Sequence, residues 1–409
     1  MSENKKQQLV PRLRFPEFCD DQSWSFQSLG RLARRSTKKN TEGDITRVLT
    51  NSAEYGVIDQ RDFFDKDIAN QGNLEGYYIV EEGDYVYNPR ISATAPVGPV
   101  SKNRIGLGVM SPLYTVFRFN NTQNDIYAHY FKSTHWHQYM RQASSTGARH
   151  DRMSITNDDF MGLPLPVSKP EEQQKIADCL SSLDDLIAAE TQKLDTLKTH
   201  KKGLMQQLFP REGEAVPRLR FPEFREAGEW ATKTLAELAE NLDNRRVPVT
   251  EKDRTKGNIP YYGASGIVDY IRDFIFDEDL LCISEDGANL RARTAPIAFS
   301  ISGKTWVNNH AHVLRFDSKC VQKIVEDYLN SISLEDYLTG MAQPKLNRAM
   351  LDTIPVPVPQ DDDEQQAVSD CLSSLDDLIT AQSQKIDAIK IHKKGLIQQL
   401  FPVLDEVPA

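Results

Sequence analysis

The chain is written twice, and this repetition limits its possible folds more than any other feature. Eight residues near the start recur letter for letter about 200 residues later, and Trp24 returns at the same separation as Trp230. A fixed internal period predicts that one structural unit is built twice. The exact repeats are PRLRFPEF at 11–18 and 217–224, CLSSLDDLI at 179–187 and 371–379, HKKGL at 200–204 and 392–396, and QQLFP at 206–210 and 398–402.

Between the repeated flanks the two halves diverge. Residues 25–162 and 231–353 share little beyond a loose layout, although each block ends in an alternating proline segment, LPLPV at 163–167 and IPVPV at 354–358. A plain duplication would drift everywhere, so we interpret the chain as a fixed frame that carries two different blocks. The tail also resembles the start of the central linker, as if a circle had been cut open. We therefore expect the two termini to lie close together.

Both long repeats predict helices with an apolar seam. Proline brackets the first helix at 170 and 210 and the second at 359 and 402. Each helix is expected to have roughly 35 residues and a length of about 50 Å. The 3-4 spacing is typical of a coiled coil. The seam residues are Ile176, Leu180, Leu183, Ile187, Glu190, Leu194, Leu197, Lys201, Leu204 and Leu208, and then Val368, Leu372, Leu375, Ile379, Gln382, Ile386, Ile389, Lys393, Leu396 and Leu400.

Two arrangements of these helices are open. Each helix can pack on its own block, or the two can pair antiparallel about a pseudo-twofold axis, as the circular repeat requires. The seam is longer than one block needs, which favours the pair, and a rigid rod would fix the distance between the blocks.

The blocks themselves are predicted to be mixed α/β globules, because short Val, Ile, Tyr and Phe runs alternate with Gly, Asn, Asp and Pro. Examples are the runs 77–80, 85–87, 274–276 and 280–283. The predicted fold class is α+β, with two such domains joined by two long antiparallel coiled-coil helices, pseudo-twofold and circularly repeated. The expected boundaries are 1–24 (lead-in), 25–167 (first domain), 168–212 (central helix), 213–358 (second domain with its lead-in) and 359–409 (distal helix and tail).

Composition bears on the compartment of the protein and on its possible partners. The 409 residues hold five cysteines without a CxxC pair, which fits reduced thiols in the cytoplasm better than disulfides or zinc. No apolar run approaches the roughly 18 residues that span a bilayer. The net charge of −10 argues at face value against nucleic acid. Phosphate binding depends on local basic clusters, however, so the total charge does not decide.

The loops of both blocks carry residues of the types that can read the edges of DNA bases. Arginine pairs with guanine in the major groove, and Asn or Gln pairs with adenine. Early basic clusters in each block suit phosphates. Loops at 146–147 and 339–340 (both Thr-Gly) fall at corresponding places, each followed by basic and amide residues. The predicted DNA-binding residues are Arg34, Arg35, Lys38, Lys39, Asn88, Arg90, Ser92, Arg149, His150, Arg152, Ser154, Arg245, Arg246, Tyr262, Ser265, Asn289, Arg291, Arg293, Asn309, Lys345, Asn347 and Arg348.

No catalytic motif is complete. The segment from Asn88 to Ile91 (NPRI) lacks the second proline and the aromatic residue of an amino-methyltransferase motif. The Gly303-Lys304-Thr305 run follows Ala298 where a phosphate loop needs Gly, so a turn between strands is expected there. His310 and His312 are interpreted as structural residues, and no metal site or catalytic residue is predicted.

Taken together, the lead-in PRLRFPEF with its Trp, the two blocks and the two helices ending in HKKGL and QQLFP closely resemble the type I restriction–modification specificity subunits (HsdS). IPYYGASG at 259–266 and WVNNHAH at 306–312 are also similar to that family's target recognition domains. The resemblance covers nearly the whole chain.

The resemblance implies that the chain recognises double-stranded DNA and is not itself an enzyme. Each domain would read one half of a split, asymmetric target. Two modification subunits would bind S-adenosylmethionine and methylate adenine N6, and two restriction subunits would use ATP and Mg for translocation and cleavage, while this chain binds no cofactor. The alternatives are a single-chain methyltransferase and a coiled-coil adaptor without DNA affinity.

Overall fold

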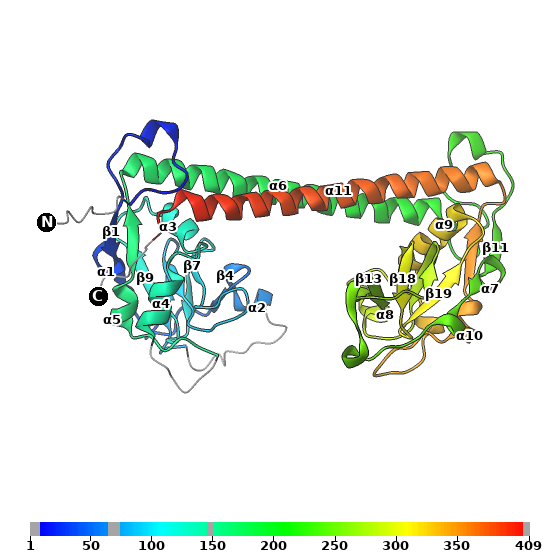
Figure 1. Cartoon of the computed structure of the whole chain (residues 1–409), viewed down its shortest axis with the longest axis horizontal. Helices are drawn as coiled ribbons and strands as arrows, with labels where there is room; N and C mark the ends of the chain where they lie inside the picture. Colours follow the sequence, from blue (N-terminus) through cyan, green and yellow to red (C-terminus); the bar gives the residue numbers. More distant parts are fainter. Residues whose placement is uncertain (1–8, 64–73, 145–150, 404–409) are drawn as a thin grey trace. The chain divides into compact units, whose positions relative to one another are not determined.

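The computed structural model describes residues 9–63, 74–144 and 151–403. The chain separates into two compact units, and both long helices are divided between them (Figure 1). Unit 1 combines residues 1–189 with 386–409, and unit 2 holds residues 190–385. Among the described residues, no helix has the length and apolar character that crossing a membrane requires.

The two long helices are α6 (Pro170–Leu208) and α11 (Asp362–Leu400), each of 39 residues and slightly longer than predicted. In unit 1, Leu180 of α6 shares an apolar cluster with Ile397 of α11. In unit 2, Leu208 of α6 shares one with Val368 of α11. Early residues of one helix therefore meet late residues of the other within each unit, which confirms the antiparallel pairing.

The predicted seam is also confirmed. Its residues are buried or half-buried along both helices, whereas most positions between them are exposed. Gln382 and Glu190, which occupy equivalent places in the repeat, meet within unit 2. The Gln382 side-chain amide donates to the Glu190 carbonyl oxygen at 2.9 Å and to its carboxylate at 2.6 Å. A polar contact of this kind inside an apolar seam favours one register of the two helices.

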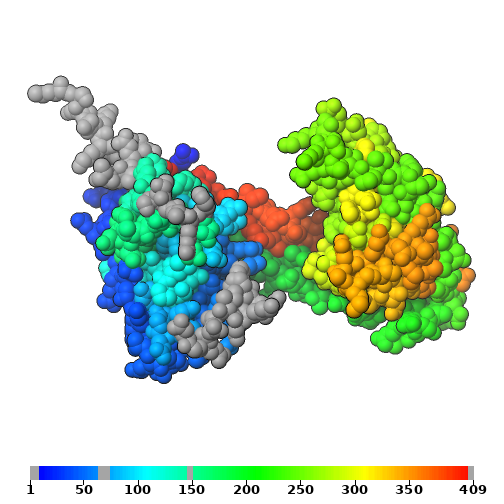
Figure 2. Space-filling view, turned by 90° about the horizontal axis from the view of Figure 1, so that it is seen from below, coloured from blue at the N-terminus to red at the C-terminus, as the bar shows by residue number. Residues whose placement is uncertain are grey.

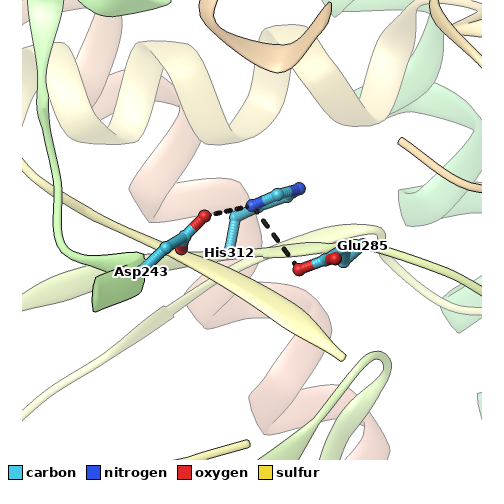
Figure 3. A group of neighbouring side chains, drawn as sticks. All are labelled: Asp243, Glu285 and His312. Carbon is cyan, nitrogen blue, oxygen red and sulfur yellow. Dashed lines mark hydrogen bonds and ion pairs between the residues drawn. The ribbon is translucent and has the colours of Figure 1, made fainter. Parts of the chain in front are cut away.

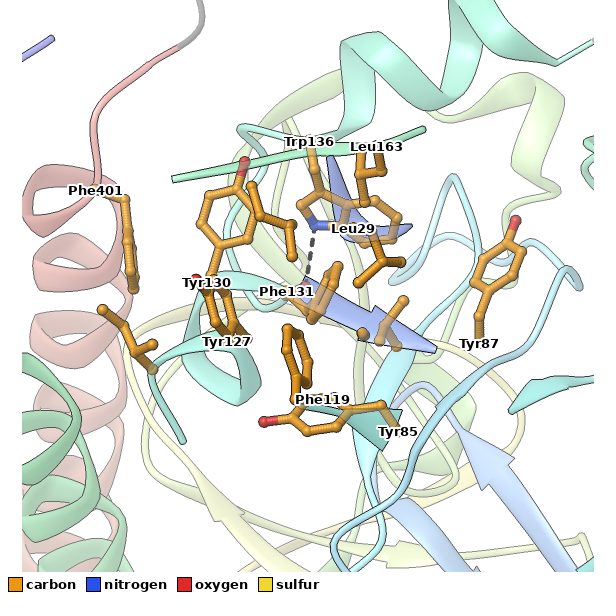
Figure 4. Close-up of a cluster of buried hydrophobic side chains, with 14 of the residues drawn as sticks. Leu29, Tyr85, Tyr87, Phe119, Tyr127, Tyr130, Phe131, Trp136, Leu163 and Phe401 are labelled. Carbon is orange, nitrogen blue, oxygen red and sulfur yellow. Dashed lines mark hydrogen bonds between the residues drawn. The ribbon is translucent and has the colours of Figure 1, made fainter. Parts of the chain in front are cut away.

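The recognition domain of unit 1 is built on a four-stranded sheet in the order β2-β9-β6-β7, with a separate β3–β4 hairpin and a β5–β8 pair. Its core is aromatic (Figure 4), with Tyr130 packed edge-on against Phe401 at the end of α11. The elements are β1 (Ser25–Ser28), α1 (Leu29–Leu32), β2 (Ala33–Arg35), β3 (Leu49–Ser52), β4 (Gly56–Asp59), α2 (Gln60–Phe63), β5 (Tyr78–Val80), β6 (Tyr85–Tyr87), β7 (Val100–Lys102), β8 (Gly108–Met110), β9 (Thr115–Phe119), α3 (Asp125–Tyr130), α4 (His137–Ala143), α5 (Asn157–Met161) and β10 (Pro164–Val167).

The recognition domain of unit 2 repeats the first sheet as β12-β19-β16-β17 and adds a second one, β14-β13-β18-β15. The run from Gly303 to Thr305 lies where β17 gives way to β18, so the predicted turn is confirmed. The elements are β11 (Ala231–Thr234), α7 (Leu235–Leu238), β12 (Glu240–Asn241), β13 (Lys256–Gly263), β14 (Gly266–Ile271), β15 (Phe276–Asp277), β16 (Leu280–Ser284), α8 (Asn289–Ala292), β17 (Ala298–Ile301), β18 (Lys304–Val307), β19 (Ala311–Arg315), α9 (Lys319–Ser331), α10 (Arg348–Asp352) and β20 (Pro355–Val358).

Each domain is closed by a two-stranded antiparallel ladder that uses the repeated proline segment, β1 with β10 in unit 1 and β11 with β20 in unit 2. Proline lacks an amide donor, so alternating prolines suit a strand with one unpaired edge. The ladders bring the start and end of each variable block together at the helices. Each block is therefore inserted into the frame through adjacent ends.

The repeated lead-ins dock on helix ends in the same way. Trp24 lies edge-on to Phe401 with ring centroids 6.4 Å apart, and Trp230 lies at the same distance and angle from Phe209. The amide of Leu13 donates to Gln399, as Leu219 donates to Gln207. The first lead-in thus docks on the end of α11 as the second docks on the end of α6. The described ends of the chain meet in unit 1, as the circular repeat predicts.

Candidate nucleic-acid interface

In unit 2, backbone hydrogen bonds draw four of the predicted DNA-reading loops together. The amide of Asn308 donates to Tyr262 at 3.0 Å, and the amide of Glu285 donates to His310 at 2.9 Å. The Ser284 hydroxyl donates to the carbonyl of Ala264. The turn after β13, the loop after β16 and the loop before β19 therefore meet at one end of the domain.

The fourth loop, before α10, joins them through a short ladder. The amide of Gly287 donates to Pro344 at 3.1 Å, and the amide of Leu346 donates to Glu285 at 2.7 Å. Lys345 lies opposite Asp286 across this ladder and is exposed. Figure 2 shows a face of unit 2 where this orange segment lies beside yellow strand residues.

Unit 1 contains the same ladder in different sequence. The amide of Ile91 donates to Asp151 at 3.0 Å, and the amide of Met153 donates to Pro89 at 2.8 Å. Arg90 and Arg152 lie opposite each other across it. Matching these two bonds to the two bonds of the unit 2 ladder places Arg152 where unit 2 has Lys345. A basic residue therefore occupies the same position of the frame in both units.

The early basic cluster of unit 1 lies near the same end of its sheet. Arg34 is exposed on β2, and the chain continues past it with the amide of Ser36 donating to Val116 of β9 at 2.8 Å. Lys38 and Lys39 follow, both exposed. Val116 is paired with Val86 of β6, two residues before Asn88. The cluster and the Asn88 loop therefore leave the sheet at the same edge.

The predicted residues divide by what their side chains do in the domain. Those exposed at the surface are Arg34, Lys38, Lys39, Arg90, Ser92, Ser154, Arg245, Ser265, Arg291, Asn309, Lys345 and Arg348. Arg35, Asn88, Arg152, Arg246, Tyr262, Asn289, Arg293 and Asn347 are partly buried. Arg149 and His150 lie outside the described residues.

Several predicted residues stabilise the domain itself, a role that residue type alone did not indicate. Arg246 donates to Glu285 and to the carbonyl of Ala311, both at 2.7 Å. Arg293 takes a left-handed conformation (φ 51°) after α8 and donates to two carbonyl oxygens.

Other predicted residues have internal partners of the same kind. Asn347 caps α10. Arg291 pairs with Glu335 and Arg245 pairs with Glu278, while Asn88 donates to a carbonyl of strand β3 and Asn289 to a carbonyl in the loop after α8. DNA contact by these residues stays a prediction.

A buried charge cluster that sequence reasoning did not assemble holds the unit 2 loops in place (Figure 3). His312 is 1% exposed; its Nδ1 lies 2.6 Å from the carboxylate of Asp243 and its Nε2 lies 2.8 Å from the carbonyl oxygen of Leu346. Each ring nitrogen thus lies within hydrogen-bonding distance of an oxygen, one on Asp243 and one on Leu346. His312 bonds the recognition loop at Leu346 directly to the sheet.

Cations surround the two carboxylates of this cluster. Burial raises the pKa of Asp243, but the hydrogen bond and charge of His312 hold that pKa below its usual range. Burial likewise raises the pKa of Glu285, and Arg246, His312 and Lys345 more than offset it. Asp243, Glu285 and His312 are close enough together to ligate a metal ion. Because both carboxylates already have side-chain partners, Asp243 in His312 and Glu285 in Arg246 and Lys345, we assign the cluster to loop positioning.

The model of the type I restriction modification DNA specificity domain matches residues 32–199 and again 227–390, which together make up most of the chain. The chain belongs to the type I restriction–modification specificity subunits. The two matches fall on the two halves of the internal repeat, so each half of this specificity subunit is one family domain.

Relatives agree with this assignment. The MjaVIII specificity subunit of Methanocaldococcus jannaschii is 24% identical over 310 residues, which cover 69% of this chain and 70% of that protein. A candidate specificity subunit of Haemophilus influenzae is 37% identical over 131 residues, and the match spans only 33% of that relative.

Two solved structures share the fold. The S subunit from M. genitalium aligns with a TM-score of 0.58 and 14% identity, over 97% of this chain and all of that one. A chain from a structure on complex assembly and conformational transition of the type I R-M system aligns with a TM-score of 0.54 and 13% identity, over 93% of this chain and 97% of that one. The predicted fold is therefore confirmed for this specificity subunit.

Proposed function

We propose that each recognition domain reads one half of a bipartite, asymmetric double-stranded DNA target. The observation that carries this proposal is the loop ladder, which has the same backbone pattern in both units and different side chains. A shared frame positions both sets of loops alike, while unlike residues on it select unlike bases. The Arg152–Lys345 equivalence, partly buried in unit 1 and exposed in unit 2, supplies a cation at the same point of each reader.

The chain's partners follow from the same proposal. Two modification subunits would use S-adenosylmethionine to methylate adenine N6, and two restriction subunits would use ATP and Mg for cleavage. The repeated helix segments support two equivalent docking surfaces for one kind of partner. In this assembly the chain is a non-catalytic reader without a cofactor of its own, and its five free cysteines fit the reducing cytoplasm.

The matched pair Arg152→Ala and Lys345→Ala tests the two readers separately. The target is first obtained by mapping methylated adenines in host DNA, and binding of the full complex is measured on that duplex over a range of salt. We expect Arg152→Ala to relax discrimination at one half-site and Lys345→Ala at the other, each by about 1–3 kcal/mol. Equal loss at both halves from either change would contradict separate readers, and wild-type binding without base preference would refute DNA reading.

A further inference from the structure

We propose that each unit enters the major groove with a two-stranded β ribbon, β13–β14 in unit 2 and β3–β4 in unit 1, and that Ile267 and Val268 contact base edges there. This inference rests on the proposed function and names the element that does the reading. None of the residues predicted from the sequence to contact DNA lies on β3, β4 or β14.

The β13–β14 ribbon exposes apolar side chains in a way that needs an explanation. Ile267, Val268 and Tyr270 are 48%, 55% and 52% exposed, and β14 is the edge strand of its sheet. The pairing of β13 with β14 shifts register at this point, with Tyr262 opposite Ile267 and Tyr261 opposite Asp269, so Val268 is the extra residue of a bulge. Ile267 and Val268 are both about half exposed near the tip of the ribbon. An apolar surface of this kind marks an interaction site, and a long bare edge invites unwanted strand pairing unless a partner uses it.

Contacts at the tip connect the ribbon to the recognition loops. The Ser284 hydroxyl donates to Ala264 in the turn of the ribbon, and the amide of Asn308 donates to Tyr262 just before it. The tip is thus continuous with the loops that hold Asn309 and Lys345. A partner that covers those loops also reaches Ile267 and Val268.

The shape and charge of the ribbon favour DNA as that partner. A two-stranded ribbon is one of the two protein elements that the major groove admits, and aliphatic side chains there make apolar contact with the thymine methyl group. Two exposed cations lie at the base of the ribbon, Lys256 on β13 and Arg272 just after β14, where the amide of Arg272 donates to Thr255 at 2.9 Å. Cationic side chains at the base of the ribbon are suited to contact the phosphates that border the groove.

Unit 1 repeats the arrangement with other residues. Its β3–β4 hairpin is joined to the Asn88 loop, because the Asn88 side-chain amide donates to the carbonyl of Asn51 on β3 at 2.9 Å. The turn of this hairpin carries Glu54 and Tyr55, and Tyr55 is 62% exposed. Both units therefore place a hairpin against the ladder of recognition loops. The tips differ, acidic and aromatic in one and aliphatic in the other, as two readers of unlike half-sites require.

The double variant Ile267→Ser/Val268→Ser tests the ribbon in the full chain bound to its modification subunits. On the duplex defined by methylation mapping, we expect about tenfold weaker binding and reduced discrimination at the half-site that Lys345→Ala affects. Val216→Ser is the matched control, because Val216, at the start of the lead-in of unit 2, is also exposed (42%) and lies outside the recognition loops and the repeated helices. It should leave affinity unchanged.

A second measurement keeps the inference open to refutation if the double variant folds poorly. A photoreactive phenylalanine analogue at position 268 should crosslink to the duplex, and the same analogue at 216 should not. If the wild type binds the target while the double variant binds equally well, or position 268 crosslinks only to a modification subunit, the ribbon is a protein-docking edge and the inference fails. If the wild type itself shows no target preference, the proposed function fails instead.

Discussion

The two units differ most clearly where each recognition domain meets the shared helices. The repeat places Asp184 and Lys393 in unit 1 where unit 2 has Asp376 and Lys201, and each Lys contacts its Asp. Unit 1 adds His129 and Lys132 to this pair, 4.0 and 3.8 Å from Asp184.

Unit 2 adds Lys323 and Asp327 from α9 to the same repeated pair. Lys201 lies 2.6 Å from both Asp327 and Asp376, and Lys323 bridges the same two carboxylates. The two helices thus carry the same Asp–Lys ion pair in both units, and each domain adds different charged or titratable residues to that pair. This difference shows that the repeated ion pair needs polar partners from the domain that packs on it, but that the identity of those partners can differ between the units.

The largest expected effect concerns a feature that the two units share, a buried arginine–glutamate ion pair between the lead-in and a long helix. Arg14 pairs with Glu172 and Arg220 with Glu364, each at 2.7 Å and almost fully buried. Replacing either arginine with Ala leaves a buried carboxylate without its partner, which typically costs about 3–5 kcal/mol. We expect Arg14→Ala to destabilise unit 1 and Arg220→Ala unit 2 by similar amounts, as measured by amide hydrogen exchange in each unit.

The control for these two variants is Arg218→Ala. Its ion pair with Glu214 is exposed on both sides and is worth well under about 1 kcal/mol. If Arg14→Ala lowered protection in unit 2 as much as in unit 1, the two lead-ins would not be independent joints.

The second prediction separates the units by pH. Burial, reinforced by the charge of Lys393, lowers the pKa of His129 to about 4, so this ring is neutral in folded unit 1. The unfolded ring has a pKa of about 6.5. The contribution of neutral His129 to the stability of unit 1 is therefore complete above pH 6.5, and it is lost as the pH falls toward 4. At pH 5 the loss from His129 is on the order of 2 kcal/mol.

The corresponding cluster of unit 2 contains no histidine. The pKa of Asp376 is lowered by its lysine partners, which outweigh burial, so its contribution is lost only below about pH 4. Hydrogen exchange at pH 7 and pH 5, corrected for intrinsic rates, should show unit 1 loosening first. His129→Gln should reduce the effect, and equal loosening of both units would disprove this assignment.

The sequence predicted the frame well because its signals are local. Proline at 170 and 210 and the 3-4 spacing predicted both helices, but the docking of the lead-ins on the helix ends did not follow from the sequence. The four-stranded sheets could not be predicted either, since β12 has only two residues and pairs with β19, some 70 residues away. The sequence placed the Thr-Gly loops at corresponding points of the repeat, but it did not predict that the recognition loops of unit 2 meet. The partner of an individual arginine did not follow from its type, and Arg246 and Arg293 bond internally because carboxylate and carbonyl acceptors surround them.

The smallest predicted effect lies in the one bond that distinguishes the two lead-in joints. The indole nitrogen of Trp230 donates to Glu364 at 3.1 Å, whereas the buried indole nitrogen of Trp24 has no hydrogen-bond partner among the described residues. Trp→Phe removes the same volume from both joints, but only Trp230→Phe breaks a hydrogen bond to a charged acceptor, worth about 1.5–3 kcal/mol. Trp230→Phe should therefore lower the stability of unit 2 by about 1.5 kcal/mol or more beyond the loss that Trp24→Phe causes in unit 1. Denaturant titration followed by hydrogen exchange in each unit measures this difference in stability. Equal losses in the two units would mean that the hydrogen bond to Glu364 contributes nothing. Both lead-ins would then be held by ring packing and by the buried arginine–glutamate pair.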